Sequence, residues 1–382
     1  MSLKIEVLTG IDEIKTLQTT WATTLASSPA DFIFLTYEWV DTWLRHYGEQ
    51  GELRVFVIRE EGSDSVLGIA PWIIRSREGF RRLATIAQET SDYEDIILAE
   101  HTNPVQAIAI LFERVMHCSD WDIIQFHRLA PDTGTLGALF HVLEQQRIDW
   151  DCRLAEVSPY IYTDGQSWDA YWASLPKNFR ANIERRQRKL CRECRDIRFS
   201  EPATHEEIQQ ALGYLFDLHQ KRRKHISGER GLFASSRTQA FYRDLAAVMY
   251  AAGWLRMPQL HIDNHLAAIQ LNFHYGKTYY KKLPAFDMAF SQYGVGDLLN
   301  VHVLRQAFDG DVTCFDFLRG NEPYKFKFMP AIRPLFSVTV FAPTARGWLA
   351  RQWFDRVRPT IGRNQIARTL MRRLRDNLYR HA

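Results

Sequence analysis

Cysteine is scarce in this sequence, with 5 among 382 residues. An odd number of cysteines, spread thinly over a long chain, does not form a disulfide framework. One pair, Cys191 and Cys194, has the spacing of a redox or zinc site, but it lies in an arginine-rich helical segment with no second pair nearby. We therefore expect ordinary helix cysteines there and no metal site.

Long apolar runs are missing as well. No segment reaches the roughly 18 apolar residues that a membrane-spanning helix needs. The N-terminal residues Met-Ser-Leu-Lys-Ile-Glu-Val lack the continuous apolar stretch of a secretory signal. Apolar residues make up 46% of the chain and charged residues 24%, which is typical of a folded globular protein rather than a disordered one. We therefore expect a cytoplasmic protein.

The net charge of +3 is small but unevenly distributed. Residues 177–195 hold eight Lys or Arg against two Glu, and from Arg346 to the end there are ten Arg against two Asp. Either run can meet an anion, such as a coenzyme phosphate, an anionic substrate or RNA. The alternative is that both are solvated helix faces.

The C-terminal run also carries apolar residues at helical spacing. These are Trp348, Leu349, Trp353, Phe354 and Val357, followed after Pro359 by Ile366, Leu370, Leu374 and Leu378. An apolar face beside a basic face is typical of a helix that lies on an anionic membrane, here the inner face of the cell membrane. The alternative is that the apolar face packs back onto the rest of the protein.

Hydrophobic periodicity predicts an α+β fold built twice. A strand-turn-strand pattern at 53–70 is repeated at 255–269, and the apolar strand at 121–126 aligns with 312–317. We expect two similar lobes, residues 1–152 and 153–343, each with a mixed, mostly antiparallel sheet between helices. Residues 344–382 are expected to form a basic helical tail.

A glycine-containing loop is the first candidate binding site. Residues 290–297, Phe-Ser-Gln-Tyr-Gly-Val-Gly-Asp, lead from an aromatic strand directly into an apolar-periodic helix. Such a loop presents backbone N–H groups and the positive end of the helix dipole, which suit a pyrophosphate. An ordinary helix cap at Asp297 explains the pattern equally well. The candidate ligand-binding residues are Tyr293, Gly294, Val295, Gly296 and Leu298.

Several motifs in the second half resemble the GNAT superfamily of N-acetyltransferases, and within it the CelD-like branch associated with cellulose biosynthesis. They occur in the order typical of that branch: a basic helix after Leu-Pro, then Leu-His-x-x-Arg, Tyr-Tyr, a glycine turn into a helix, and an Asp-Phe-Leu-Arg-Gly-x-Glu-x-Tyr-Lys string. The residues are Leu175-Pro176 with Arg180, Arg185, Arg186 and Arg188; Leu218-His219 with Arg222; Tyr279-Tyr280; Gly296; and Asp316–Lys325. In the first half, 34–39 and 92–95 also fit, so the resemblance covers about residues 5–340.

Two positions depart from the pattern. GNAT enzymes bind the coenzyme A pyrophosphate on a Gln/Arg-x-x-Gly-x-Gly/Ala loop, whereas this chain has Ser291 in place of the basic residue. Asp297 stands where the branch often has Thr, which puts a negative charge at a helix N-terminus that is expected to receive phosphate. Coenzyme binding therefore depends on where the Asp297 side chain points.

The resemblance implies that an amine or hydroxyl attacks the thioester carbonyl of acetyl-coenzyme A or another acyl-coenzyme A, with no covalent enzyme intermediate and no metal. Consistent with this, no Gly-x-Ser-x-Gly turn marks a serine nucleophile. Such a reaction needs a base for the acceptor and donors for the oxyanion; a strand N–H near 272–275 is one candidate donor. The acceptor implied by the branch is a cell-surface glycan, its precursor or another small molecule.

Candidate catalytic groups are Asp287, Tyr280, Glu322 and Tyr324, although the tyrosines also suit core packing. Candidate substrate-binding residues are His219, Arg222, Asp316, Arg319 and Lys325; Asp316 is equally explained by an ion pair with Arg319, and His219 by a place in the core. Two other functions remain open. The first is aminoacyl transfer from tRNA, because Fem-type transferases share the doubled architecture and take aminoacyl groups from tRNA. The second is a non-catalytic accessory role in polysaccharide export.

Overall fold

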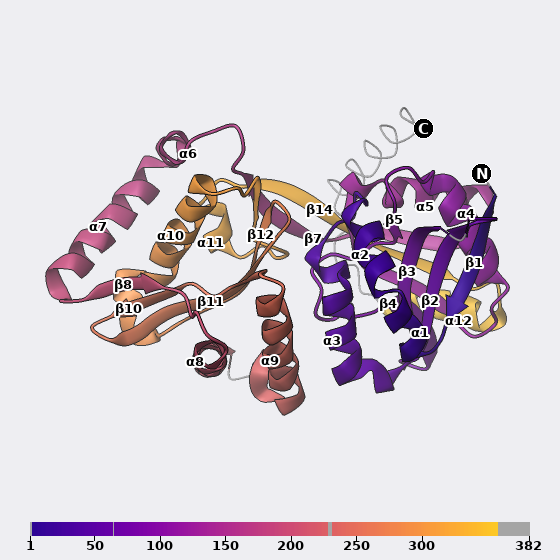
Figure 1. Ribbon diagram of the computed structural model, residues 1–382, viewed down its shortest axis with the longest axis horizontal. Coiled ribbons are helices and arrows are strands. Elements are labelled where there is room, and N and C mark those ends of the chain that lie inside the picture. The colour runs from indigo at the N-terminus through magenta and orange to yellow at the C-terminus, as the bar shows by residue number, and fades with distance from the viewer. Residues whose placement is uncertain (1, 64, 228–230, 358–382) are drawn as a thin grey trace. The chain divides into compact units, whose positions relative to one another are not determined.

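The computed structural model describes residues 2–63, 65–227 and 231–357, without the side chains of 222–227 and 355–357 (Figure 1). The chain divides into two compact units. The first contains residues 1–156 and continues from Pro334, whereas the second contains residues 157–333. The predicted tail beyond residue 357 lies outside the described residues.

The first unit contains a mixed sheet with the strand order β1-β2-β3-β4-β6-β14-β7. Neighbouring strands from β1 to β4 are antiparallel, β4 and β6 are parallel, and β14 is antiparallel to β6. The strands are β1 (Leu3–Leu8), β2 (Glu52–Glu60), β3 (Val66–Arg77), β4 (Phe80–Thr85), β6 (Ile123–Leu129), β14 (Ala331–Phe341) and β7 (Trp150–Tyr162), with a short β5 (Ile97–Leu98) paired to β3.

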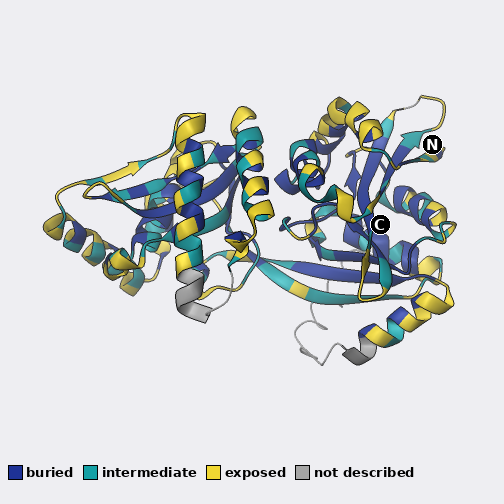
Figure 2. Ribbon diagram, turned by 90° about the horizontal axis from the view of Figure 1, so that it is seen from below, coloured by how far each residue is buried: buried dark blue, intermediate teal, exposed yellow. Residues whose placement is uncertain are grey.

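Helices cover this sheet because its strands alternate apolar residues on both faces. Phe56, Trp72 and Phe126 on one face pack with α4 (Pro104–Met116) and α5 (Thr135–Gln145) in a single core cluster. Alternate residues such as Ile69 are buried toward the other face, where α2 (Gln18–Ala26) packs on β3. Figure 2 shows the result: buried strands and helices whose outer faces are exposed. The remaining helices of this unit are α1 (Ile11–Thr16), α3 (Tyr37–Tyr47) and α12 (Ala345–Val357).

The second unit has the strand order β7-β13-β12-β11-β10-β8, in which only β12 and β13 are parallel. The strands are β8 (Ile197–Ser200), β10 (Gln259–Ile262), β11 (His265–Tyr275), β12 (Thr278–Phe286) and β13 (Cys314–Asp316), with β9 (Leu255–Arg256) paired to β11. The helices are α6 (Trp168–Ser174), α7 (Lys177–Glu193), α8 (His205–Ser227), α9 (Ser236–Ala251), α10 (Val295–Asp309) and α11 (Pro323–Phe326). Residues of α6, α7 and α10 share one apolar cluster with Phe315 and Phe317.

The two units repeat one arrangement. In each, four antiparallel strands are followed by a helix and then by a strand parallel to the fourth. The helix is α4 in the first unit and α10 in the second. Ala84 lies opposite Gln125 in the first parallel pair, and Tyr280 lies opposite Asp316 in the second. The predicted mixed, mostly antiparallel α+β fold is therefore confirmed, and Gln125 and Asp316 occupy matching positions.

The unit boundaries differ from those predicted from the sequence. Residues 334–343 were expected in the second lobe, but the structure assigns them to the first unit. The reason is that β14 returns to pair with β6, where Phe336, Val338 and Val340 join the first core. The pattern of a buried strand does not specify which sheet it joins, and no strand was expected there.

The cysteines form no disulfide among the described residues. Cys191 lies exposed on α7, Cys194 is the C-cap residue of the same helix, and both are free thiols. Within the described ranges, no three His, Cys, Asp or Glu side chains are grouped so that they could hold a metal ion. In the same ranges, no helix is both long enough and apolar enough to cross a membrane.

Candidate active site

Strand β12 forms one wall of the candidate site in the second unit. It pairs with β11 over its whole length but with β13 only from Thr278 to Tyr280. Beyond Asp316 the chain turns through two residues with positive φ, Leu318 at 59° and Gly320 at 116°. The two parallel strands therefore separate after Tyr280, while β12 continues to Phe286.

A lysine–tyrosine pair lies where β12 and β13 separate. The Nζ of Lys281, a residue that is 2% exposed, donates to the Oη of half-buried Tyr324 at 3.0 Å. The ammonium group also lies 4.3 Å from the Tyr324 ring centroid and 5.6 Å from that of Phe317. A cation held beside a hydroxyl and between aromatic rings stabilises negative charge on the hydroxyl oxygen.

Asp316 is bound within the protein. Its Oδ1 accepts hydrogen bonds from the Ser158 hydroxyl at 2.9 Å and from the Leu318 N–H at 2.7 Å. Its Oδ2 is ion-paired with Arg333 at 3.1 Å. An ion pair was one interpretation of Asp316, and the structure shows one with Arg333. These contacts anchor the end of β13.

Lys325 holds the turn that follows. This residue is 3% exposed, and its Nζ donates to the carbonyl oxygens of Leu318 at 2.9 Å and Arg319 at 2.6 Å. It also forms an ion pair with Glu322 at 3.0 Å. All three ammonium hydrogens can thus be used within the protein. The Glu322 side chain remains 55% exposed beside Tyr324.

The glycine-containing loop lies at the other end of β12. The Asp287 carboxylate accepts a hydrogen bond from the Ala289 N–H at 2.9 Å and so caps a 3₁₀ turn over Met288–Tyr293. Gly294 then adopts the left-handed conformation, with φ of 64°, and serves as the N-cap of α10 without a side chain that could cap it. The first-turn N–H groups of Val295 and Gly296 belong to a helix end that has no side-chain cap.

Basic side chains surround this helix end. Arg186 of α7 donates to the Asp297 carboxylate at 2.9 Å, and Lys327 donates to the same oxygen at 3.0 Å. A Cβ on Gly294 would meet the Arg186 side chain. Lys189 donates to Gln292 at 3.0 Å. Two cations therefore offset the negative charge of Asp297 and leave the helix end electropositive.

The predicted site residues fall into two groups. The loop residues and Asp287 lie together, and so do residues 316–325. Six residues of strand separate Asp287 from Lys281, which corresponds to about 20 Å. The structure therefore does not bring Asp287 to the string that contains Tyr324. The side chains of Tyr293, Val295 and Leu298 are buried in the core cluster, which leaves only their backbone for the predicted ligand contact.

The other predicted residues lie elsewhere. Tyr280, 2% exposed, follows Tyr279 in the strand and so points to the opposite face from Tyr279 and Lys281. His219 of α8 contacts the Phe233 ring edge-on at 5.1 Å. The Arg319 carbonyl accepts from Lys325, and the Arg222 side chain lies outside the described residues.

The expected oxyanion donor near 272–275 is already used. The His274 N–H donates to the Trp254 carbonyl at 2.7 Å, because β11 is an interior strand. Beside it, Tyr279 is buried, its hydroxyl accepts from Asn272 at 3.1 Å, and its burial raises the pKa of the phenol. Tyr279 therefore stays neutral and stabilises the core.

Sequence reasoning missed Lys281, Arg186, Ser158 and Arg333. Their partners are far away in the chain: 43 residues separate Lys281 from Tyr324, and 111 separate Arg186 from Asp297. Lys281 directly follows the Tyr-Tyr pair, and Arg186 belongs to the basic run, so both lie in segments that the sequence had marked.

Comparison with known proteins connects this geometry to a family. Residues 177–326 match the family described as acetyltransferase (GNAT) domain. This segment includes α7, β12, the glycine-containing loop, α10 and Tyr324. No curated protein matches the chain.

Solved structures share the fold over both units. FemX has a TM-score of 0.62 at 10% identity, over 88% of this chain and 96% of that one. A conserved protein of unknown function from Bacteroides thetaiotaomicron gives 0.55 at 11% identity, over 88% and 100%. The C-terminal domain of a protein described as a lysylphosphatidylglycerol synthetase, from Agrobacterium fabrum, gives 0.52 at 12%, over 87% and 95%. Residues 177–326 are thus similar to a GNAT domain, and the fold over both units is similar to that of FemX.

Proposed function

We propose that the second unit is an acyltransferase that moves an acyl group from acyl-coenzyme A to an amine or hydroxyl acceptor. The course of strand β12 supports this proposal. The strand runs about 20 Å from the Lys281–Tyr324 pair to a helix N-terminus without a side-chain cap. An extended pantetheine chain with a thioester at one end and a pyrophosphate at the other fits such a path.

The phosphate end of the donor is assigned to α10. Its first-turn N–H groups and helix dipole attract the pyrophosphate. Arg186 supplies the guanidinium that Ser291 does not, and it reaches the loop from α7 instead of from the loop itself. The matching helix of the first unit is different: α4 begins with Pro104, which has no N–H, and the Asn103 side chain caps it by accepting from Gln106. Coenzyme binding is therefore assigned to the second unit alone.

The acyl end is assigned to the Lys281–Tyr324 pair. When the acceptor nitrogen or oxygen attacks the thioester carbonyl, a bond to carbon forms, and the carbon–sulfur bond then breaks. The departing thiolate takes a proton from the Tyr324 hydroxyl, and Lys281 stabilises the resulting charge on the tyrosine oxygen. Glu322, half exposed next to Tyr324, is assigned to remove the acceptor proton. Asp287 keeps a positioning role, since it caps the turn before the loop.

The acceptor proposed from the CelD-like resemblance is a cell-surface polysaccharide or its precursor. A second candidate function is aminoacyl transfer from tRNA. The FemX-like fold supports it, because Fem-type transferases use this donor, and α7 presents an exposed basic face with Arg185, Arg188 and Arg192. Contact with an anionic membrane through α12 is proposed as well, and the exposed Trp348 and Leu349 support it.

Native mass spectrometry separates the donors. The purified protein is incubated with equal concentrations of acetyl-coenzyme A and a charged tRNA, and the retained species is weighed. Retention of one acetyl-coenzyme A per chain supports the proposal. Retention of tRNA in its place supports the second candidate. Retention of neither contradicts both and favours a non-catalytic accessory role.

A further inference from the structure

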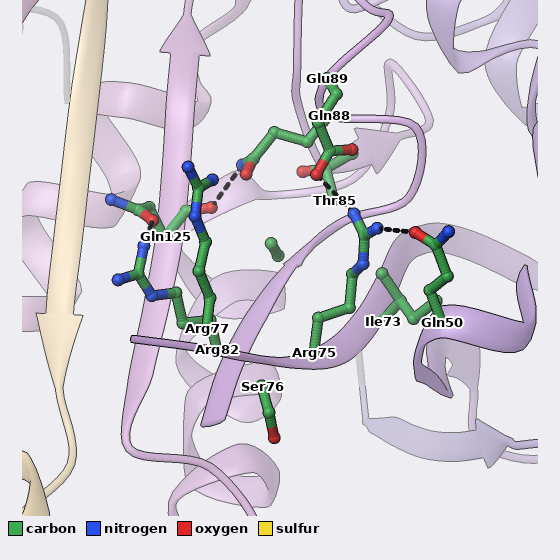
Figure 3. A pocket seen from close by; sticks show the side chains of 11 residues that line it. Gln50, Ile73, Arg75, Ser76, Arg77, Arg82, Thr85, Gln88, Glu89 and Gln125 are labelled. Atoms are coloured by element: carbon green, nitrogen blue, oxygen red, sulfur yellow. Dashed lines mark hydrogen bonds and ion pairs between the residues drawn. The ribbon is translucent and has the colours of Figure 1, made fainter. Parts of the chain in front are cut away.

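A polar cavity lies within the first unit. It has a volume of about 330 Å³ and opens beside β3, β4 and β6 (Figure 3). Three arginines line it, Arg75, Arg77 and Arg82, against a single carboxylate, Glu89. An adjoining hollow of about 260 Å³ shares Arg77, Arg82 and Gln125 and is also lined by Trp353 and Phe354 of α12.

Three buried donors without a hydrogen-bond partner among the described residues belong to side chains that line this cavity. They are the Nε2 of Gln125, the Nε of Arg82 and the Oγ1 of Thr85. The residues are only 2%, 8% and 3% exposed, respectively. Buried polar groups in folded proteins are nearly always hydrogen-bonded, because a buried group without a partner loses its hydrogen bonds to water and gains none in exchange. Three donors without partners on the residues of one cavity indicate that the cavity binds a ligand with hydrogen-bond acceptors.

The acceptors of the cavity are already used by other donors. Arg82 donates through Nη1 to Gln125 Oε1 at 3.3 Å and through Nη2 to Glu78. Arg75 is ion-paired with Glu89 and donates to Gln50 at 2.6 Å. The Gln125 carbonyl accepts from Gln88 at 2.9 Å, as Figure 3 shows. What remains among the lining residues is the charge of Arg77 and the three donors named above.

Comparison of the two units indicates that the missing acceptor is an anionic group. Gln125 occupies the position that Asp316 has in the second unit, opposite the fourth strand. There the carboxylate belongs to the chain: it accepts from Ser158 and Leu318 and pairs with Arg333. In the first unit an amide stands at that position, beside Arg82 of β4, whose counterpart in the second unit is Thr278.

We propose that this cavity binds an organic anion, a carboxylate or a phosphate monoester with an apolar body. Its acidic group accepts hydrogen bonds from Arg82, Thr85 and Gln125, and the exposed Arg77 adds charge. Its apolar body lies against Trp353 and Phe354 in the adjoining hollow. This site is separate from the acyl-transfer site and is occupied without reaction.

Calorimetry on the intact chain tests the proposal with three probes of similar size: phenyl phosphate, benzoate and benzyl alcohol. One of the two anions is expected to bind at least about tenfold more tightly than the neutral alcohol, since charge-assisted hydrogen bonds are the stronger ones. The preferred anion then identifies the class as phosphate or carboxylate. Equal affinity for all three, or no binding at millimolar concentration, overturns the proposal.

Variants locate the binding. Gln125→Glu supplies a carboxylate from the chain, as Asp316 does, and is expected to abolish anion binding without lowering the melting temperature. Arg77→Ala, at an exposed position that the fold tolerates, is expected to weaken binding about tenfold. Arg305→Ala on α10, where the side chain is 63% exposed, is the control and leaves binding unchanged. Wild-type affinity in both Gln125→Glu and Arg77→Ala contradicts the proposed site.

Discussion

At the scale of single residues, the Tyr324 hydroxyl performs the proton transfer in the proposed reaction. Lys281 donates to it at 3.0 Å, so the oxygen is held in place and its hydrogen points elsewhere. Tyr324→Phe is expected to lower turnover by about 10²–10⁴-fold with unchanged affinity for acetyl-coenzyme A. Thiol release with a panel of amines and alcohols measures turnover, and calorimetry measures affinity.

The control for this variant is Tyr214→Phe, since Tyr214 is 59% exposed on α8. It is expected to match the wild type in both measurements. A Tyr324→Phe protein that loses affinity and turnover together, with a lowered melting temperature, shows that Tyr324 supports the fold instead of the reaction.

Arg186 is expected to replace the basic residue that the loop lacks. Arg186→Ala removes a guanidinium next to the phosphate and leaves Asp297 with only Lys327 as its cation. We expect about tenfold weaker binding of coenzyme A and a smaller dependence on salt, because a charge-assisted contact is lost. Arg188→Ala, on the same helix with a 72% exposed side chain, is the matched control. Equal affinities in the two variants exclude a role for Arg186 in binding.

Asp95 predicts how stability depends on pH. Burial raises the pKa of this carboxyl from 3.8 to about 7, and nearby Asp132 adds to the increase. Because the folded state binds this proton more tightly than the unfolded state, the protonated carboxyl contributes its full stability at low pH. That contribution is lost as the pH rises from the unfolded-state pKa to the folded-state pKa near 7. Stability is therefore expected to fall between about pH 4 and pH 7, by up to about 4 kcal/mol.

Urea unfolding of Asp95→Asn measures this effect. Asparagine cannot ionise, so the decline is expected to flatten, with a remainder from Glu94, whose pKa burial also raises. The exposed Asp164→Asn is the control and keeps the wild-type slope. An unchanged slope in Asp95→Asn means that Asp95 does not titrate in this range.

Among the elements, helix α12 has one side buried against the first unit and one side exposed to solvent. Ala350 and Phe354 are buried in a cluster with Phe341, and Arg346 is ion-paired with Asp122 at 3.0 Å. On the other side, Trp348 and Leu349 are 62% and 53% exposed. Helix α12 thus packs back onto the first unit while part of its apolar surface stays available. The rest of the predicted tail lies outside the described residues.

The exposed side is expected to bind anionic vesicles in low salt and to release them in high salt. A double variant, Trp348→Ser with Leu349→Ser, leaves the buried contacts of α12 intact and is expected to remain in the supernatant. Tyr214→Ser, which removes a similarly exposed aromatic residue from α8, is the control and still pellets. If the double variant pellets as the wild type does, α12 is not the membrane contact.

Most elements could be predicted from the sequence because their periodicity is local. The alignment of 121–126 with 312–317 even matched Gln125 to Asp316, as the strand registers do. Helix α7 and the loop before α10 were found for the same reason. Strand β14 was not, since its partner β6 lies some 200 residues earlier, as Ser337 and Phe126 illustrate with a separation of 211. The ion pairs Arg186–Asp297 and Arg333–Asp316 depend on such long-range contacts too.

In the whole molecule, the two units repeat one arrangement but differ at matching positions. In the second unit, the helix after the fourth strand starts at a glycine without a side-chain cap, and Asp316 is satisfied within the protein. In the first unit, the helix start is capped by Asn103, and the Nε2 of Gln125, a residue that lines a cavity, has no hydrogen-bond partner among the described residues. These differences support the proposals of acyl transfer in the second unit and anion binding in the first.

Calorimetric titration of Gly294→Ala with acetyl-coenzyme A tests whether acyl-coenzyme A binds at the N-terminus of α10. Gly276→Ala is the matched control, because Gly276 has a similar φ of 56° but nothing near its Cβ position, whereas a Cβ on Gly294 would displace Arg186. Both variants carry the same backbone strain of about 1–2 kcal/mol. We expect wild-type affinity in Gly276→Ala and at least about tenfold weaker binding in Gly294→Ala. Equal affinities in the two variants, or no binding by the wild type, would contradict binding at this helix end.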